Sequence, residues 1–336
     1  MVSAGEYIGK KLSEQSSLRT SIPKRGAITT YFLFPNYAIR LWTNSLIVDR
    51  RGIDSYIVVG HSTNGQAVGI NYKVGAPADS WTTIEENYAD YPVTLDFRID
   101  VAKWLNNESF TEPSYAEIGT GATVYDYTQT ANVTPSGVRK IIETKDNSTS
   151  KEVEYDVRFI DRNDSNIREI ALFNASSSGT MMIRYVISDL DMSIDNEYRF
   201  RIKLNIDDIT PGDAMVTDYG LNEIRDACSG DSADRPDYNE WSDGTGTMAS
   251  GDTSLDGSNK QRNQEKTLTD SRPPAPGYRV SWLFILTTSQ LNSQTLRKSG
   301  LFTDASGNTL FAQNRFGDIS KTDLFKVQEQ PSITVR

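Results

Sequence analysis

The chain has 336 residues, which is long enough for two or three domains that each bury a core. Its 45 Asp and Glu residues outnumber its 35 Lys and Arg residues, and the resulting net charge of -10 argues against a broad surface for nucleic acid. The single cysteine, Cys228, excludes an internal disulfide and a thiolate-based metal centre. No apolar run reaches the roughly 18 residues of a membrane helix and the N-terminus has no apolar signal core, so we expect neither membrane insertion nor a cleaved signal.

The N-terminal quarter is predicted to hold an arm followed by strands. Residues 1–25 are small and polar, with basic pairs such as Lys10-Lys11, and we expect such an arm to order on docking; residues 2–17 also suit a short helix. Residues 26–95 are predicted to form an N-terminal β region, which we interpret as a degenerate third module because 55–66 loosely echoes 114–125. Within it, Asn64-Gly65 predicts a type I′ hairpin turn before an alternating strand over 67–74.

The remaining chain is predicted to form two β modules, 96–210 and 211–336. Each opens with a short helix, predicted over 100–106 and over 219–228. Apolar residues then alternate with polar ones at 153–159, 198–206 and 278–286, which predicts strands with one face in a core. The expected fold class is mainly β, with tandem antiparallel β-sandwich-like modules and a few short helices.

An internal repeat supports this division. "IALFNASSSGTMMIR" at 170–184 and "SGLFTDASGNTLFAQ" at 299–313 lie 129 positions apart, and 167–189 aligns without a gap onto 296–318. Further upstream, "PSYAEIGTG" at 113–121 parallels "PDYNEWSDGTG" at 236–246. We interpret the two halves as a tandem duplication of one β module that contains a Leu-Phe hairpin.

The residues that usually carry chemistry do not form a catalytic pattern. His61 is the only histidine, and its surroundings fail the Gly-x-Ser-x-Gly elbow because Asn64 stands where the second glycine belongs, so we interpret it as a turn residue. Asp161, Asp164 and Asp304 lie in turn-like surroundings without the spacing of a calcium loop. We therefore predict no enzyme, no catalytic residue, no cofactor and no metal site.

Two binding alternatives stay open at this point. Trp81, Trp104 and Trp241 could stack on sugars, although alternation favours burial for most of them. A weakly held calcium ion in the 230–260 loop is the other alternative. Its ligands would come from Asp231, Asp234, Asp237, Asp243 and Asp252.

A recurring pattern runs through both modules: a Gly-x-Gly turn, then Leu-Phe at the start of a hairpin. Its residues are Gly119, Gly121, Leu172 and Phe173 in the first module and Gly244, Gly246, Leu301 and Phe302 in the second. This plan resembles a module of tailed bacteriophages, found at the virion-attached end of tail-collar fibres and in baseplate-associated proteins. The second module departs from the family pattern at Lys298 and Ser299, where Glu and Ile are expected, and the first has Ala171 in place of Gly.

The resemblance implies a non-enzymatic structural component of a tailed virus particle, in the tail or baseplate, that connects a fibre or neighbouring subunits to the virion. Its partners would be other virion proteins, it would form a symmetric homo-oligomer in the particle, and it would be assembled in the host cytoplasm. Capsid or neck decoration and a tail module that binds host glycans are the alternatives of the same kind. A polysaccharide depolymerase, which needs a carboxylate pair in a groove, is the enzymatic rival.

Overall fold

The structure is a computed structural model that describes residues 19–20, 29–61, 67–75, 81–87, 91–160, 162–264, 267–272 and 278–336. These residues are mainly β, with 51% of the chain in strands and 9% in helices, and they form three sheets that are mostly antiparallel. The mainly β fold class predicted from the sequence is confirmed. Within the described residues, no helix is both long and apolar enough to cross a membrane.

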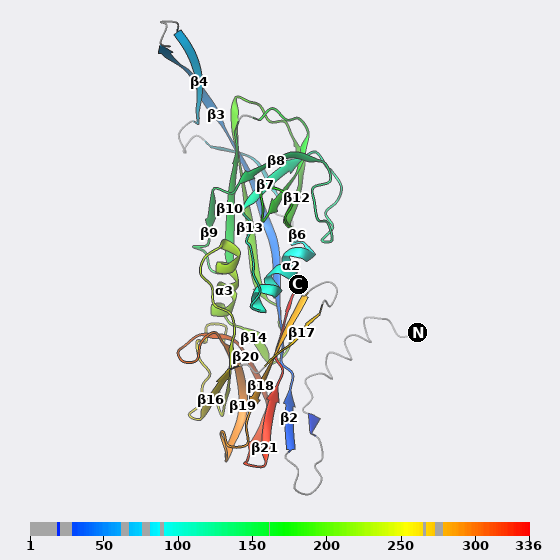
Figure 1. Ribbon diagram of the computed structural model, residues 1–336, viewed down its shortest axis with the longest axis vertical. Coiled ribbons are helices and arrows are strands. Elements are labelled where there is room, and N and C mark those ends of the chain that lie inside the picture. Colours follow the sequence, from blue (N-terminus) through cyan, green and yellow to red (C-terminus); the bar gives the residue numbers. More distant parts are fainter. Residues whose placement is uncertain are drawn as a thin grey trace, which may run out of the picture. The chain divides into compact units, whose positions relative to one another are not determined.

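The elements follow one another along the chain as shown in Figure 1. Those before residue 95 are strands: β1 (Arg19–Thr20), β2 (Thr29–Leu33), β3 (Asn36–His61), β4 (Ala67–Gly75), β5 (Thr82–Asn87) and β6 (Tyr91–Pro92). The next eight elements are α2 (Leu95–Leu105), β7 (Tyr115–Gly119), β8 (Pro135–Ile141), β9 (Thr144–Asp146), β10 (Glu152–Phe159), β11 (Ile167–Phe173), β12 (Met181–Leu190) and β13 (Asn196–Asp208).

The C-terminal part of the chain again consists of strands and one helix. Its elements are β14 (Ala214–Val216), α3 (Asp218–Ser229), β15 (Tyr238–Ser242), β16 (Lys260–Gln264), β17 (Thr267–Arg272), β18 (Tyr278–Leu286), β19 (Gln294–Phe302), β20 (Leu310–Lys321), β21 (Phe325–Glu329) and β22 (Ser332–Val335).

The chain divides into two compact units that are each built from separate segments. The central unit comprises Trp42–Phe97 and Glu112–Asn205, and the C-terminal unit comprises Met1–Leu41, Arg98–Thr111 and Ile206–Arg336. The central unit holds a four-stranded sheet in the order β12-β11-β7-β8, and the C-terminal unit holds a five-stranded sheet in the order β14-β20-β19-β15-β16. The remaining strands belong to the third sheet. The predicted module boundaries stay a prediction.

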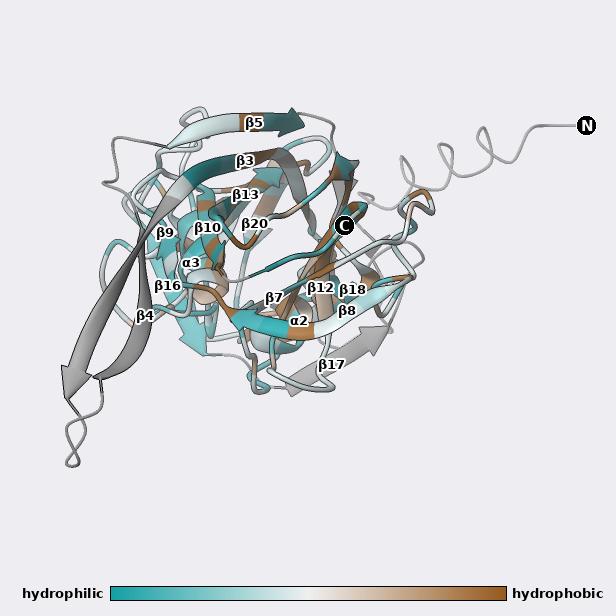
Figure 2. Ribbon diagram, turned by 90° about the horizontal axis from the view of Figure 1, so that it is seen from above, coloured by the Kyte–Doolittle hydropathy of each residue, from teal (hydrophilic) through white to brown (hydrophobic). Residues whose placement is uncertain are grey.

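Alternation along the long strands fixes the core, as predicted. In β10 every second residue from Val153 to Phe159 is fully buried, and in β13 the same holds from Tyr198 to Ile206. These two strands pair antiparallel, so their apolar faces form one layer, and Figure 2 shows hydrophilic and hydrophobic residues alternating along both. The helix predicted over 219–228 is also confirmed as α3, whereas α2 begins five residues before its predicted start.

The duplicated hairpin is present twice with the same register. In the first copy Leu172 lies opposite Ile183 and Phe173 opposite Met181, with one register shift between them. In the second copy Leu301 lies opposite Ala312 and Phe302 opposite Leu310, with the shift at the equivalent place. Because a one-residue slip would reverse every side chain, a shared bulge position is strong support for a common ancestor of the two hairpins.

The helices are attached to these hairpins in the same way in both halves. Thr94 precedes α2, and its Oγ1 donates to the backbone oxygen of Met181 at 2.7 Å while accepting from the N–H of Phe97 at 3.2 Å. Thr217 precedes α3, and its hydroxyl lies between the Leu310 oxygen and the Gly220 N–H at 2.5 and 3.2 Å. One threonine therefore caps a helix and ties it to the hairpin in each module.

Some of the sequence predictions concern residues that lie outside the described residues of the structure. They are most of the arm at 1–25, the Asn64-Gly65 turn, part of the 55–66 echo, and Asp161. β3 and β4 do pair antiparallel, and their last described pair is His61 opposite Ala67.

Candidate functional site: the duplicated module and a charged sheet face

The motif residues of the repeated pattern lie in the interior of each module. Leu172, Phe173, Leu301 and Phe302 are at most 1% exposed. Phe173 packs with Ala171 and Met181 against Tyr115, and its counterpart packs in a cluster of Leu255, Phe302 and Leu310 against Tyr238. These anchors hold the hairpin to the strand before it, so their role is packing.

A buried ion pair lies at the centre of the central unit's hairpin sheet. Glu169 and Arg184 have fully buried side chains, and the Arg184 Nε donates to the Glu169 carboxylate at 2.8 Å. The same carboxylate accepts backbone N–H groups from Gly121 at 3.1 Å, Val133 at 3.1 Å and Thr134 at 2.8 Å. One charged side chain thereby fixes the loop between β7 and β8 on the hairpin.

The C-terminal unit keeps this arrangement but reverses the sign at the same register position. Lys298, which occupies the position of Glu169, is 1% exposed and forms an ion pair with Asp256. Asp256 in turn accepts the backbone N–H of Gly246 at 2.7 Å. Gln313 replaces the buried arginine and donates to Asp252 at 2.8 Å. The buried charge of Lys298 is therefore compensated by a carboxylate from a loop.

The motif glycines lie where backbone and carboxylate approach closely. A Cβ on Gly121 would lie 2.6 Å from the Glu169 Oε1, and one on Gly244 would lie 2.5 Å from the Asp256 Cγ. The strand register pairs Ser242, not Gly244, with the counterpart of Glu169. The repeated Gly-Thr-Gly therefore reflects crowding around a carboxylate, buried Glu169 in one module and the more exposed Asp256 in the other, more than an identical strand position.

Substitution of Gly121 by alanine is expected to lower the stability of the central unit by about 1–3 kcal/mol, because the methyl group collides with a fixed carboxylate. Gly52 is the matched control, since nothing lies within 4 Å of a Cβ there. Urea unfolding of Gly121→Ala and Gly52→Ala measures the difference. Equal midpoints for the two variants would contradict this account of the motif.

An arginine fixes the tip of each hairpin. In the central unit Arg139 stacks at 3.5 Å on the Phe173 ring, pairs with Glu117, and donates to the Ala175 oxygen at 2.8 Å. In the C-terminal unit Arg262 stacks at 3.5 Å on Phe302 and pairs with Glu240 at 3.1 Å. It also donates to the backbone oxygens of Asp304 and Gly307. In each unit the planar guanidinium group stacks on an aromatic ring, forms an ion pair with a glutamate and donates to backbone oxygens of the hairpin loop.

Replacing Arg262 with lysine is expected to cost about 1–2 kcal/mol and to loosen residues 303–308, because an ammonium group lacks the planar fork. Limited proteolysis of this loop, together with urea unfolding, measures both effects. Arg315→Lys is the control, because Arg315 lies on β20 in the same hairpin without this stacking contact among those described. Unchanged cleavage of Arg262→Lys would show that the clamp does not fix the loop.

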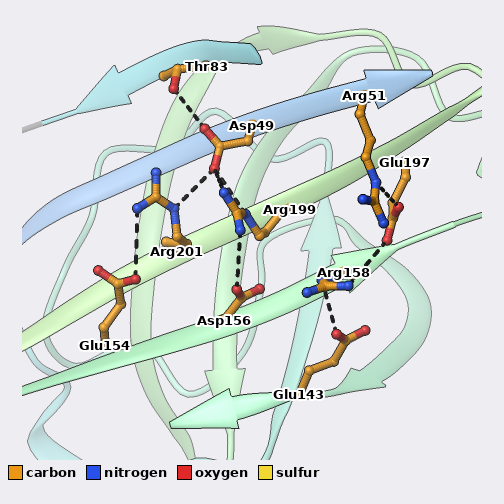
Figure 3. Close-up of polar contacts among 10 residues, drawn as sticks. All are labelled: Asp49, Arg51, Thr83, Glu143, Glu154, Asp156, Arg158, Glu197, Arg199 and Arg201. Atoms are coloured by element: carbon orange, nitrogen blue, oxygen red, sulfur yellow. Dashed lines mark hydrogen bonds and ion pairs between the residues drawn. The ribbon is translucent and has the colours of Figure 1, made fainter. Parts of the chain in front are cut away.

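A second cluster covers the polar face of β3, β10 and β13 in the central unit, and Figure 3 shows it. We call this the charged face; its residues are Asp49, Arg51, Thr83, Glu143, Glu154, Asp156, Arg158, Glu197, Arg199 and Arg201. Asp49 is its centre, because its carboxylate accepts from Thr83 at 2.8 Å, Arg199 at 2.7 Å and Arg201 at 3.1 Å. Burial alone would raise the pKa of Asp49, but these hydrogen bonds outweigh burial and lower it.

The acidic and basic side chains of the charged face pair with one another, and two of its arginines lie over the Trp81 ring. The guanidinium carbons of Arg51 and Arg199 lie 4.3 and 4.6 Å from the Trp81 ring centre. Arg51 also contacts Glu197 at 2.6 Å. Burial raises the pKa of Asp156 despite the nearby arginines. This geometry suits a rigid sheet face and places the Trp81 ring, one of the candidates for sugar stacking, against two guanidinium groups.

A buried carboxyl group lies in the core of the C-terminal unit. Glu329 is fully buried and accepts from the Ser299 hydroxyl at 2.5 Å and from the Asn239 amide at 3.0 Å. Both donors are neutral. Burial raises the pKa of Glu329 to about 7, against the effect of these hydrogen bonds. Its two hydrogen-bond partners are themselves buried, so the carboxyl group joins β21 to β15 and β19 in the interior of the unit.

The other residues considered from the sequence, namely the candidate sugar-stacking tryptophans and metal-binding aspartates, do not form a site. Trp241 is fully buried and Trp104 is 9% exposed. Asp164 pairs with Arg162, and Asp304 accepts the Ser306 N–H at 2.6 Å within its turn. Across the described residues, no three His, Cys, Asp or Glu side chains gather in a group that could hold a metal ion, the candidate calcium ligands included.

Comparison of the chain with protein-family models, with curated proteins and with solved structures found no match. The functional reading therefore depends on the repeat and on the geometry described above. Sequence reasoning missed Asp49, Glu329 and the two arginine clamps. For the clamps a signal existed, because Arg139 and Arg262 follow Glu117 and Glu240 by the same 22 residues.

Proposed function

We propose that this chain is a non-enzymatic structural protein of a tailed virus particle, located in the tail or baseplate, where it connects a fibre or neighbouring subunits to the virion. The observation that carries the proposal is the duplicated module. Two hairpins share register, bulge, helix cap and arginine clamp, and they carry the Leu-Phe pattern that resembles the tail-collar module.

The distribution of polar groups supports an architectural role. The charged side chains of the repeat are used in fixing loops and sheets, as Glu169, Lys298, Arg139 and Arg262 illustrate. Two rigid copies of one platform can meet two neighbours in an assembly. An architectural protein works through surfaces that contact its neighbours, and stable β modules present such surfaces through their loops.

The experiment that tests this function measures binding of the purified chain to tails and to capsids from the same virus, in parallel with a glycan array. Binding to tails without retention of glycans is the expected result. Strong glycan binding without tail binding would replace the proposal by the glycan-binding alternative, and binding to capsids alone would replace it by capsid decoration.

A further inference from the structure

Two neutral side chains hold the carboxyl group of Glu329 in the interior of the C-terminal unit. The Ser299 hydroxyl on β19 donates to one carboxyl oxygen at 2.5 Å, and the Asn239 amide on β15 donates to the other at 3.0 Å. Trp241 lies opposite Ser299 in the register and two residues beyond Asn239, so its side chain shares their face of the five-stranded hairpin sheet. The Trp241 indole therefore faces the layer that contains Glu329.

Tyr37 lies on the third sheet, on the same face as Glu329. Along β18, Glu329 pairs with Phe284 and Ile333 pairs with Val280 in one uninterrupted register. Residues four apart on a strand share a face, and Tyr37 lies opposite Ile333 in the parallel pair of β22 and β3. Burial first, and then the charge of Glu329, raises the pKa of the Tyr37 hydroxyl well above its ordinary value, so the two groups are neighbours.

Three buried atoms near this carboxyl group have no hydrogen-bond partner among the described residues. They are Trp241 Nε1, Asn239 Oδ1 and the Tyr37 hydroxyl oxygen, and each belongs to a side chain that is at most 1% exposed. Burial raises the pKa of Glu329 and the nearby Trp241 N–H partly offsets this, yet the two groups do not reach the geometry of a hydrogen bond. Buried polar atoms are nearly always paired with protein or with ordered water, so three such atoms in one place indicate a bound molecule.

The chemistry of the three atoms selects the kind of molecule. An indole N–H only donates, an amide oxygen only accepts, and a phenol hydroxyl does both. A cation cannot accept the Trp241 N–H, and an anion would be repelled by the Asn239 oxygen and by the carboxyl oxygens of Glu329. A small neutral molecule that both donates and accepts satisfies all three atoms, and water is such a molecule.

The repeat supplies an apolar counterpart of this cluster. The equivalent positions in the hairpin sheet of the central unit hold three fully buried apolar residues. In the register they are Ala116 for Asn239, Ile118 for Trp241 and Ile170 for Ser299. The second copy thus places polar groups where the first packs hydrocarbon. Polar groups in a core have to be satisfied by one another or by a bound molecule.

We propose that the C-terminal unit holds one buried water molecule beside Glu329, between the hairpin sheet and the third sheet. The water accepts the Trp241 N–H and donates to Asn239 Oδ1, and its remaining hydrogen bonds go to the Tyr37 hydroxyl and the Glu329 carboxyl group. It thereby links β15 to β3 and β21. The inference goes beyond the proposed function, because it concerns the interior of the unit and not its partners.

A crystal structure of the full wild-type chain tests the site directly. The expected result is a density peak within about 3.2 Å of both Trp241 Nε1 and Asn239 Oδ1. The space between Ala116 and Ile118 in the central unit is the internal control and is expected to show no peak. Absence of the peak beside Trp241, in a map that shows other buried waters in the same molecule, overturns the proposal, and so does a direct hydrogen bond from Trp241 to Glu329 in its place.

Nuclear magnetic resonance tests the same water in solution. In the full chain labelled with ¹⁵N, the Trp241 indole N–H, assigned by its loss in Trp241→Phe, is expected to show a cross-relaxation peak to water with the sign of a long-lived contact. Tyr37→Phe and Ser299→Ala are the controls, because they remove the hydroxyl groups whose exchanging protons imitate water. The peak is expected to persist in both. A peak that is absent in wild type, or that vanishes with either hydroxyl, overturns the proposal whether or not the chain binds tails.

Discussion

Replacement of Glu169 by alanine is expected to lower the free energy of unfolding of the central unit by about 3–5 kcal/mol. The variant leaves the Arg184 guanidinium buried without its carboxylate, and both side chains are fully buried in the wild type. It also removes the acceptor of three backbone N–H groups, those of Gly121, Val133 and Thr134. An unpaired buried charge and orphaned donors are among the costliest single changes a core can suffer.

Urea unfolding, followed by hydrogen exchange of strands β11 and β12, measures this loss in the unit that holds the pair. Arg168→Ala is the matched control on the neighbouring residue, because Arg168 and its ion-pair partner Asp189 are 38% and 57% exposed, so their ion pair should contribute little to stability. A loss of similar size in the two variants would contradict the central position assigned to Glu169.

The second large effect is expected from Glu329→Gln, and it depends on pH. Burial raises the pKa of Glu329 from its ordinary 4.5 to about 7. Between these values the folded chain keeps a proton that the unfolded chain releases, so the free energy of unfolding falls as pH rises through this window. Above it, the penalty is constant at about 3 kcal/mol, since each pKa unit corresponds to about 1.4 kcal/mol. Glutamine carries no charge at any pH, so the Glu329→Gln variant does not incur this penalty.

The stability difference between Glu329→Gln and wild type is therefore expected to be near zero at pH 4.5 and to grow toward pH 8. Denaturant unfolding at a series of pH values, followed by hydrogen exchange of β19 and β21, measures it. Glu108→Gln, at an exposed position in the same unit, is the control and is expected to leave the pH profile unchanged. A variant that gains no stability at alkaline pH would show that Glu329 does not carry a buried charge there.

The parts of the fold that follow from local pattern were predictable. Strands β10, β13 and β18 and helix α3 each show their period in the sequence, and their apolar residues are buried accordingly. The hairpin repeat was predictable too, because β11 and β12 align with β19 and β20 without a gap. Local periodicity and repetition need no knowledge of the partner strand.

The polar centres were not predictable, because their partners are distant in sequence. Glu329 in "FKVQEQP" shares a strand face with Val327, but the local sequence does not reveal that its partners in the core are Ser299 and Asn239. Asp49 meets Arg199 and Arg201 150 and 152 positions away. Lys298 gives no local sign of burial, and only the position of Asp256 explains why a buried lysine is tolerated. Charge alone does not reveal burial when pairing satisfies it.

The proposed function places this chain in a tailed virus, and mass spectrometry of purified tails and purified capsids from a tailed virus whose genome encodes the chain tests that place most directly. The account predicts that the chain is recovered with the tails in a fixed ratio to other tail proteins, and that deletion leaves particles without complete tails or fibres. Absence of the chain from purified particles, with assembly intact after deletion, would contradict the central claim.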